Sequence, residues 1–322
     1  MKNLALPATI DQDCFPLRIT FEEPVSTREF AHWYADNQAD VTAFLHQKGA
    51  VLFEGLPLGS VEQFGPVAGA MAEEFTDYID ISYQRRKLSA NVYVSTEYDA
   101  AFPIKLHNEL SYANRWPSRL IFGCILPAAA GGETPLADSR RVLQSLDPDL
   151  LAELRARKIR YVRNLHGGQG FGYSWQETFR TTDRDAVETY CRREQMACHW
   201  KEDGGLKLVA VRPPVRRHPV TGEEVWFSVA ELYHPSHFSK EYYETLIILA
   251  QGNEEELPLY SSFGDGTRIP DAAIREIIRT IESQVTLRTW NQGDLLLLDN
   301  MLVSHGRMPY KGERQVVVYL GK

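Results

Sequence analysis

The 322-residue sequence has no excess of basic residues, because 35 lysines and arginines stand against 43 aspartates and glutamates, a formal charge of −8. Without an overall positive field, a protein has little to attract nucleic acid or an anionic membrane surface. Long apolar runs are missing too: the best, such as 295–298, are far shorter than the roughly 18 residues of a membrane helix. These absences predict that the protein binds neither nucleic acid nor membrane. The poor match of residues 1–15 to a secretory signal predicts a cytoplasmic location.

Cysteine is scarce, and four residues are too few for a disulfide framework in a chain of this length. Cys124 lies in the apolar run LIFGCIL and is expected to be a small buried side chain. Cys191, Cys198 and His199 resemble part of a zinc site, but no second CxxC pair accompanies them. Ordinary packing is therefore the favoured interpretation of these three residues.

Regular alternation of strands and helices is also absent, which argues against a doubly wound sheet. Short segments rich in Val, Ile, Phe and Tyr recur instead between Pro and Gly residues, as is typical of strands. These strand candidates are 91–95, 103–109, 119–126, 134–137, 225–230, 294–299 and 315–320. The pattern predicts a mostly β protein with α insertions, built as a decorated β-sandwich or barrel.

Helices are predicted in four places. Two candidate capping boxes, Ser26 with Glu29 and Ser60 with Gln63, open helical stretches in the N-terminal part. Residues 139–158 form a helical region interrupted near Pro148, and isoleucines 274, 277, 278 and 281 form one apolar helix face. No linker or repeat divides the chain. We therefore expect one domain over residues 1–322, with a mixed N-terminal region 1–90 and a helical or loop insertion at about 139–224.

The segment PIKLHNEL contains a pattern that could bind a metal. His107 and Glu109 lie two residues apart in an extended segment, where such positions point to the same face. One imidazole and one carboxylate on a shared face provide two ligands of a metal site. An H-x-E pattern is common in proteins, so a surface histidine and glutamate without a metal remains the alternative at this point.

His305 is the best candidate for a third ligand, because it follows the apolar run LLLLD and a turn-like Asn300. Two histidines and one carboxylate leave open positions on one side of a metal, which is the geometry of non-haem iron(II) oxygenases. A bidentate 2-oxo acid and dioxygen could occupy those positions. The remote carboxylate of the 2-oxo acid would then need a cationic fork, which Arg307 or Arg314 could supply.

Three blocks of sequence resemble one known family. LHNELSY, GGETPLADSR and WNQGDLLLLDNMLVSHGRMPYKGER are similar, in this order, to blocks of the iron(II)/2-oxoglutarate-dependent oxygenases of the taurine dioxygenase and clavaminate synthase type. Together the blocks span about two-thirds of the chain. The resemblance implies a double-stranded β-helix (jelly roll) with helical insertions, and it implies iron(II), 2-oxoglutarate and dioxygen as cofactor and co-substrates.

The resemblance also implies roles for individual residues. His107, Glu109 and His305 match the metal ligands of the family. Thr134 and Arg314 match the residues that bind the C5 carboxylate of 2-oxoglutarate. Arg307, in the HGR motif, is a feature of the closer subgroup, and its role is open between orienting the substrate and tying down a loop.

The carboxylate ligand narrows the expected reaction. Glu109 stands where taurine dioxygenase more often has Asp, whereas the clavaminate synthase branch and its amino-acid-oxidising relatives use Glu. Related halogenases have Ala or Gly at this position, so halogenation is disfavoured. Hydroxylation, epoxidation and desaturation remain.

The subgroup predicts a small amino-acid or peptide-like substrate from a natural-product (antibiotic) pathway, either free or tethered to an acidic peptidyl carrier protein. Two basic clusters give mild support to a carrier partner, one at Arg85, Arg86 and Lys87 and one at Arg212, Arg216 and Arg217, although solvated loops are the favoured explanation of either cluster. The alternatives are a catabolic dioxygenase of a small sulfonate or carboxylate, and a non-catalytic jelly-roll binding module. A zinc hydrolase would leave Thr134 and Arg314 unexplained, and the acidic charge disfavours a demethylase acting on nucleic acid or chromatin.

Overall fold

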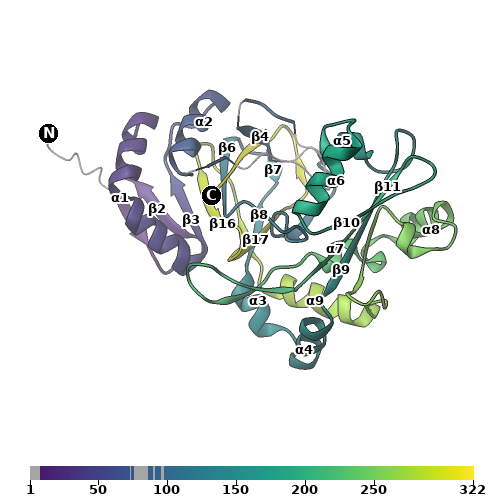
Figure 1. Ribbon diagram of the computed structural model, residues 1–322. Coiled ribbons are helices and arrows are strands. Elements are labelled where there is room, and N and C mark those ends of the chain that lie inside the picture. The colour runs from purple at the N-terminus through teal and green to yellow at the C-terminus, as the bar shows by residue number, and fades with distance from the viewer. Residues whose placement is uncertain (1–7, 73, 76–85, 90, 96–97) are drawn as a thin grey trace.

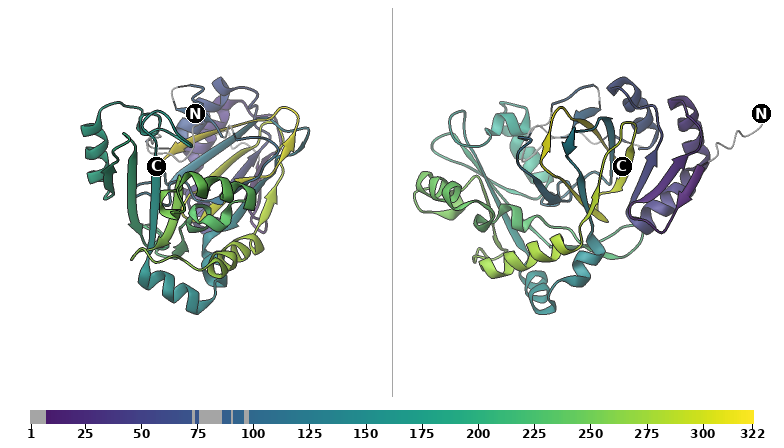
Figure 2. Two further views of the ribbon diagram at one scale, coloured as in Figure 1. Left: turned by 90° about the vertical axis from the view of Figure 1, so that its right-hand side faces the viewer. Right: turned by 180° about the vertical axis from the view of Figure 1, so that it is seen from behind.

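Two facing β-sheets with helices on their outer sides form the body of the protein (Figure 1). The computed structural model describes residues 8–72, 74–75, 86–89, 91–95 and 98–322. The purple N-terminal helices and the green helices of the second half lie on opposite flanks of the strands, as the turned views also show (Figure 2). Among the described residues, no helix is long and apolar enough to cross a membrane.

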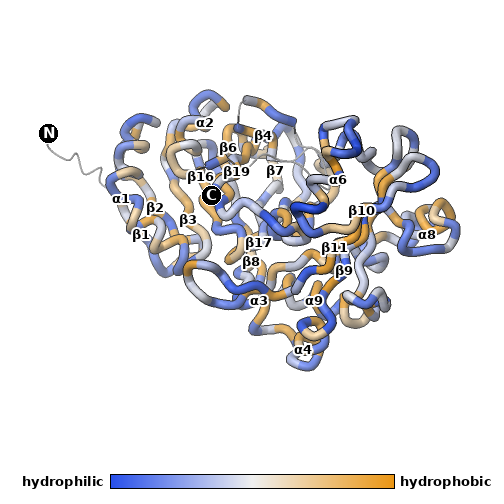
Figure 3. Tube along the Cα trace, viewed as in Figure 1, coloured by the Kyte–Doolittle hydropathy of each residue, from blue (hydrophilic) through white to orange (hydrophobic). Residues whose placement is uncertain are grey.

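The larger sheet has seven strands, all paired antiparallel except for the parallel pair β2 and β3. In spatial order they are β1 (Ala8–Asp11), β2 (Leu17–Phe21), β3 (Ala50–Glu54), β16 (Leu295–Asp299), β6 (Arg119–Leu126), β19 (Gln315–Gly321) and β4 (Val92–Val94). Both faces of its central strands are buried: along β16, Leu295 and Leu297 face one apolar core, whereas Leu296 and Leu298 face another. Burial on both faces explains the uninterrupted apolar runs of these strands, and Figure 3 shows hydrophobic residues gathered there.

The smaller sheet faces the larger one across the second of these cores. Its strands, in spatial order, are β15 (Thr286–Arg288), β8 (Thr134–Asp138), β17 (Val303–Arg307) and β5 (Ile104–His107). Leu136 and Val303 of this sheet pack with Leu120, Phe122 and other residues of the larger sheet. The prediction of a jelly roll with helical insertions is therefore confirmed.

The segment 139–224 holds strands as well as the helices and loops expected there. A third sheet consists of β10 (Ala197–Trp200), β11 (Leu206–Arg212), β9 (Ile159–Leu165) and β14 (Leu259–Phe263). Two short strand pairs complete the β-structure: β12 (Val215–Arg217) pairs with β13 (Glu224–Trp226), and β18 (Tyr310–Lys311) pairs with β7 (Ala130–Gly131). The sequence pattern missed this sheet because apolar, polar and charged residues are mixed within its strands, as in IRYVRNL of β9 and LKLVAVR of β11.

Helices cover the sheets on their outer faces (Figure 1). They are α1 (Thr27–Lys48), α2 (Val61–Ala70), α3 (Ser139–Ser145), α4 (Pro148–Arg157), α5 (Trp175–Phe179), α6 (Arg184–Arg193), α7 (Ala230–Tyr233), α8 (Lys240–Leu249) and α9 (Asp271–Ser283), with 3₁₀ turns at Pro235–His237 and Glu254–Glu256. The break at Pro148 is confirmed, since α4 begins at this proline. Ile274, Ile277 and Ile281 form the predicted buried face of α9.

The two predicted capping boxes have different outcomes. At Ser26 both reciprocal hydrogen bonds with Glu29 are present. At Ser60 the hydroxyl accepts a hydrogen bond from the backbone N–H of Gln63. The side-chain oxygen of Gln63, however, accepts from the backbone N–H of Gly59 instead of that of Ser60, so the capping box is incomplete. Gly49 caps the C-terminal end of α1; its φ of +78° favours glycine, and a Cβ there would collide with Val303.

Candidate metal centre and co-substrate pocket

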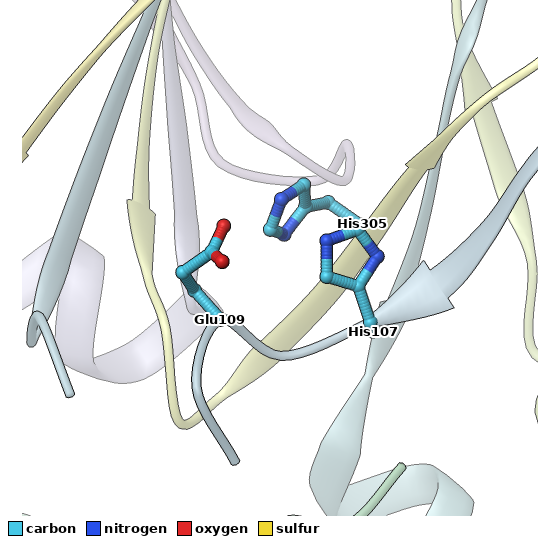
Figure 4. A group of neighbouring side chains, drawn as sticks. All are labelled: His107, Glu109 and His305. Atoms are coloured by element: carbon cyan, nitrogen blue, oxygen red, sulfur yellow. The ribbon is translucent and has the colours of Figure 1, made fainter. Parts of the chain in front are cut away.

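Two adjacent strands bring the two candidate histidines together. His107 ends β5 and His305 lies directly opposite it in β17, so their ring centroids are 4.6 Å apart (Figure 4). The Nδ1 atom of His107 lies 2.9 Å from the carbonyl oxygen of Lys105, a contact that fixes the orientation of the ring. A bulge between His305 and Arg307 places Gly306 so close to the Ile104 carbonyl oxygen that an added Cβ would lie 2.5 Å from it. Glycine is therefore required at this position of the HGR motif.

The carboxylate of Glu109 points toward both rings (Figure 4). Glu109 is 3% exposed and follows β5 in a turn whose next residue, Leu110, has a φ of +56°. Its backbone is held by Asn300: the Glu109 N–H donates to Asn300 Oδ1 at 2.7 Å, and Asn300 Nδ2 donates to the Glu109 carbonyl at 2.9 Å. This paired contact fixes Glu109 relative to the strand that carries His305.

The three side chains form a site that suits a divalent metal. Their candidate ligand atoms, two imidazole nitrogens and a carboxylate oxygen, all lie within 4.8 Å of one another. Within the described ranges this is the one cluster of three or more such side chains, and Cys191, Cys198 and His199 do not form another. A buried set of two histidines and one carboxylate fits the facial arrangement of non-haem iron(II).

We expect Asn300→Ala to weaken binding of a divalent ion by about 10- to 100-fold, because the backbone that carries Glu109 loses both of its amide contacts. Anaerobic titration calorimetry with Mn(II) measures the effect. Asn164→Ala is a matched control, since Asn164 also bridges backbone carbonyls, those of Glu255 and Leu257. An equal loss of Mn(II) affinity in both variants would refute a specific role for Asn300.

A cavity beside the histidines contains the residues expected to bind 2-oxoglutarate. Thr134, Arg314 and Arg307 line it together with His107 and His305. Thr134 Oγ1 accepts a hydrogen bond from Trp290 Nε1 at 2.8 Å, which leaves its hydroxyl proton able to donate to a carboxylate. Arg314 Nε is buried and has no hydrogen-bond partner among the described residues. Burial, with Arg307 nearby, lowers the pKa of Arg314 to about 10, so the side chain stays charged at neutral pH. The charge and the available donors of the cavity therefore suit an anionic co-substrate.

Arg307 makes contacts of a different kind. Its guanidinium donates to the carbonyl oxygens of Tyr98, Asp99 and Phe102 at 2.6–2.8 Å. These three bonds favour the second of the two predicted roles, tying down the loop at the rim of the cavity.

Two contributors to the site were missed by the sequence reasoning. The sequence indicates only a turn at Asn300, and it shows Trp290 only as part of the last of the three similar blocks. The motif WNQGD…DN holds both, but their partners, Thr134 and Glu109, lie more than 150 residues away in the chain.

The predicted basic cluster of Arg212, Arg216 and Arg217 does not form a surface patch. Arg212 is 5% exposed and donates to the carbonyl oxygens of Glu194 and Gln195, so its inclusion in an exposed docking patch was wrong. Only Arg217 of that group is exposed. In the other cluster Arg86 and Lys87 are exposed, and Arg85 lies outside the described residues.

Glu231 is a buried carboxyl group on α7, and burial raises its pKa to about 8. Its Oε2 atom has no hydrogen-bond partner within the described part of the chain. Between pH about 4.5 and 8 the folded state keeps a proton that the unfolded state releases, so the free energy of unfolding falls as the pH rises. Above pH 8 the loss is complete.

We therefore expect Glu231→Gln to be more stable than the wild type at pH 8.5, by about 2–4 kcal/mol, and to show a much smaller gain at pH 5. Urea unfolding of both proteins at the two pH values measures the difference. A gain that does not depend on pH would show that Glu231 is not the titrating group.

Comparisons with known proteins agree with this geometry. A family model described as "Taurine catabolism dioxygenase TauD, TfdA family" matches residues 14–320. The chain is 38% identical to the dapdiamide synthesis protein DdaC of Enterobacter agglomerans over 280 residues, 87% of this chain and 84% of DdaC. It is 28% identical to a clavaminate synthase-like protein of Arabidopsis thaliana, over 87% of this chain and 83% of that one.

Solved structures share the fold at low sequence identity. PvcB from Pseudomonas aeruginosa has a TM-score of 0.55 at 14% identity, over 95% of this chain and 85% of PvcB. An asparagine oxygenase in complex with Fe(II), 3-hydroxyasparagine and succinate has a TM-score of 0.56 at 14% identity, over 92% of this chain and 82% of that chain. The chain belongs to the TauD, TfdA family of dioxygenases, the iron(II)- and 2-oxoglutarate-dependent oxygenases that its motifs resemble.

Proposed function

We propose that the protein oxidises a C–H or C=C bond of a small amino-acid or peptide-like substrate in natural-product biosynthesis, with His107, Glu109 and His305 as its iron(II) ligands. One observation carries the proposal: these three side chains lie within reach of a single ion, beside a cavity that also contains Thr134 and Arg314. The relative DdaC, a dapdiamide synthesis protein, supports the pathway class, and the asparagine oxygenase of similar fold agrees with an amino-acid substrate.

When bound, the iron would supply the oxidising chemistry, in which 2-oxoglutarate, dioxygen and the substrate give succinate, carbon dioxide and the oxidised substrate. The protein's own residues bind and orient. Arg314 and Thr134 hold the distal carboxylate of 2-oxoglutarate, and the charged fork of Arg314 fixes its direction. Phe122 and Val316, which line the same cavity, exclude water from the reacting atoms.

The free and the carrier-bound form of the substrate are both part of this proposal, and the carrier would be an acidic peptidyl carrier protein.

We place the reaction in the cytoplasm. All four cysteines lie within the described part of the chain and none of them forms a disulfide, in keeping with a reducing compartment.

The test is anaerobic reconstitution with iron(II) and 2-oxoglutarate, exposure to dioxygen, and measurement of substrate-dependent succinate. The panel contains free amino acids and the same amino acids loaded on a peptidyl carrier protein. Succinate that depends on a member of either set, and disappears in Glu109→Ala, is the expected result.

The family description favours one other class, because it names taurine catabolism. Succinate produced only with a sulfonate or an aryloxy acid would therefore replace the amino-acid proposal with a catabolic one. A non-catalytic binding module would yield no succinate with any compound.

A further inference from the structure

The loop that carries Glu109 is closed at its base by a single side chain. Asn300 Nδ2 donates to the carbonyl oxygens of both Glu109 and Pro117, at 2.9 Å each. Asn300 is fully buried, so the loop 109–117 starts and ends at one fixed point beside the metal centre. Residues within this loop are therefore positioned relative to the candidate iron ligand.

Two aromatic residues of this loop each pack against an arginine from the segment 139–224. The guanidinium of Arg163 lies 5.5 Å from the ring centroid of Tyr112, and that of Arg216 lies 5.1 Å from the ring centroid of Trp116. Trp116 also packs on Phe227, with ring centroids 4.8 Å apart. Two positive charges thus border the loop on the side of the third sheet and the β12–β13 pair.

Among the residues that the structure describes, Arg216 differs from its neighbours in having no polar partner. Its Nε and one Nη atom are buried, and the side chain forms no hydrogen bond or ion pair with any residue that the structure describes. Arg212, by contrast, donates to the carbonyl oxygens of Glu194 and Gln195. Burial and the charge of Arg212 both lower the pKa of Arg216.

Arg216 is half-buried, and two buried guanidinium nitrogens without an acceptor are unfavourable for stability, because their N–H groups lose hydration and gain no compensating contact. Packing on Trp116 offsets only a small part of this. Such an arrangement is expected where a ligand supplies the missing acceptor. The planar fork of arginine matches a carboxylate, which accepts two parallel N–H bonds.

We propose that Arg216, packed on Trp116 at the loop 109–117, binds a free carboxylate of the substrate. This inference rests on the proposed function and deepens it, since it assigns the substrate to the carboxylic acids. A substrate joined to a carrier through that carboxyl group would be a thioester there and would not offer the anion. The subsite therefore favours a free acid, or a tethered unit with a second carboxylate.

The subsite can be tested without iron, 2-oxoglutarate or a known substrate. The probe is sodium acetate, the simplest carboxylate, and the readout is the thermal unfolding midpoint of the full-length protein at constant ionic strength. All proteins carry Arg314→Ala, so that acetate bound in the 2-oxoglutarate cavity does not contribute. Inorganic phosphate and uncharged acetamide are the comparison probes.

Acetate is expected to raise the unfolding midpoint of the Arg314→Ala protein. When Arg216→Met is added, the acetate concentration that gives the same rise of the midpoint should increase by at least about tenfold. Arg217→Gln, which changes the exposed neighbour, should respond to acetate as the background does. Without acetate, Arg216→Met should unfold at the same or a higher temperature, because an unpaired buried charge has been removed. If the Met variant does not fold, Arg216→Lys is used, and it should keep part of the response.

Three results would overturn the proposal: an acetate response that Arg216→Met or Arg216→Lys leaves unchanged, no response in the background, or a response to phosphate that exceeds the one to acetate. None of these results would count against the proposed iron-dependent activity, because the measurement involves neither iron nor 2-oxoglutarate. Failure of the proposed function would instead appear as absent succinate in the reconstitution assay.

Discussion

His305→Ala is expected to lower the affinity for a divalent ion by more than about 100-fold and to abolish succinate production. His305 lies opposite His107 in the pairing of β17 with β5, and its removal leaves two of the three proposed ligands. Loss of a group that only orients a ligand already weakens metal binding by about 10- to 100-fold, so loss of a ligand itself should have a larger effect. Anaerobic equilibrium dialysis with iron(II), followed by metal analysis, measures the affinity.

His234→Ala is the matched control for this variant. His234 is also fully buried, but its ring nitrogens contact Ser236 and the carbonyl oxygen of Ile269. The control should lose stability and keep its affinity for iron(II). Undiminished iron binding or activity in His305→Ala would remove His305 from the metal site.

Arg314→Ala is expected to weaken 2-oxoglutarate binding by about 2–5 kcal/mol, because a carboxylate in a dry cavity loses its charged partner. Arg314 lines the cavity beside His107 and His305, and its buried Nε has no hydrogen-bond acceptor among the described residues. Titration calorimetry with 2-oxoglutarate and Mn(II), in the absence of oxygen, measures the change.

Arg314→Lys should restore only part of the affinity, since a single ammonium group cannot form two parallel hydrogen bonds to a carboxylate. Unchanged binding in Arg314→Ala would transfer the role to Arg307 or another cation. The three carbonyl contacts of Arg307 make this outcome unexpected.

Thr134→Val is expected to have a smaller effect, about 1–3 kcal/mol on 2-oxoglutarate binding. The substitution removes one hydrogen-bond donor to the carboxylate, and it also leaves the Trp290 N–H without its acceptor. The same calorimetric titration measures it. An effect as large as that of Arg314→Ala would mean that the threonine does more than donate one hydrogen bond.

Local patterns in the sequence predicted a decorated β-sandwich or barrel and the three candidate metal ligands, and the family resemblance added the jelly roll and the roles of Thr134 and Arg314. His107 and Glu109 are two residues apart, and the last block carries His305, Arg307 and Arg314 within ten residues. The strand β16 was visible as four consecutive leucines, which both faces of the sheet bury.

Other parts of the site depend on contacts between distant segments, which no local pattern reveals. Asn300 holds Glu109 across 191 positions of sequence, so its role appears only when β16 and β5 are folded together. Arg216 looked like part of an exposed basic cluster, whereas the fold buries Arg212 and packs Arg216 on Trp116. A run of charged letters does not indicate which side chains the tertiary structure will cover.

The most direct test of the central claim is a crystal structure of the protein with Mn(II) and N-oxalylglycine, the pair present in one solved relative by fold. We predict one ion bound by His107, Glu109 and His305 at about 2.0–2.2 Å. The distal carboxylate of N-oxalylglycine should lie against Arg314 and Thr134. An ion held elsewhere, or bound by fewer than all three side chains, would contradict the account.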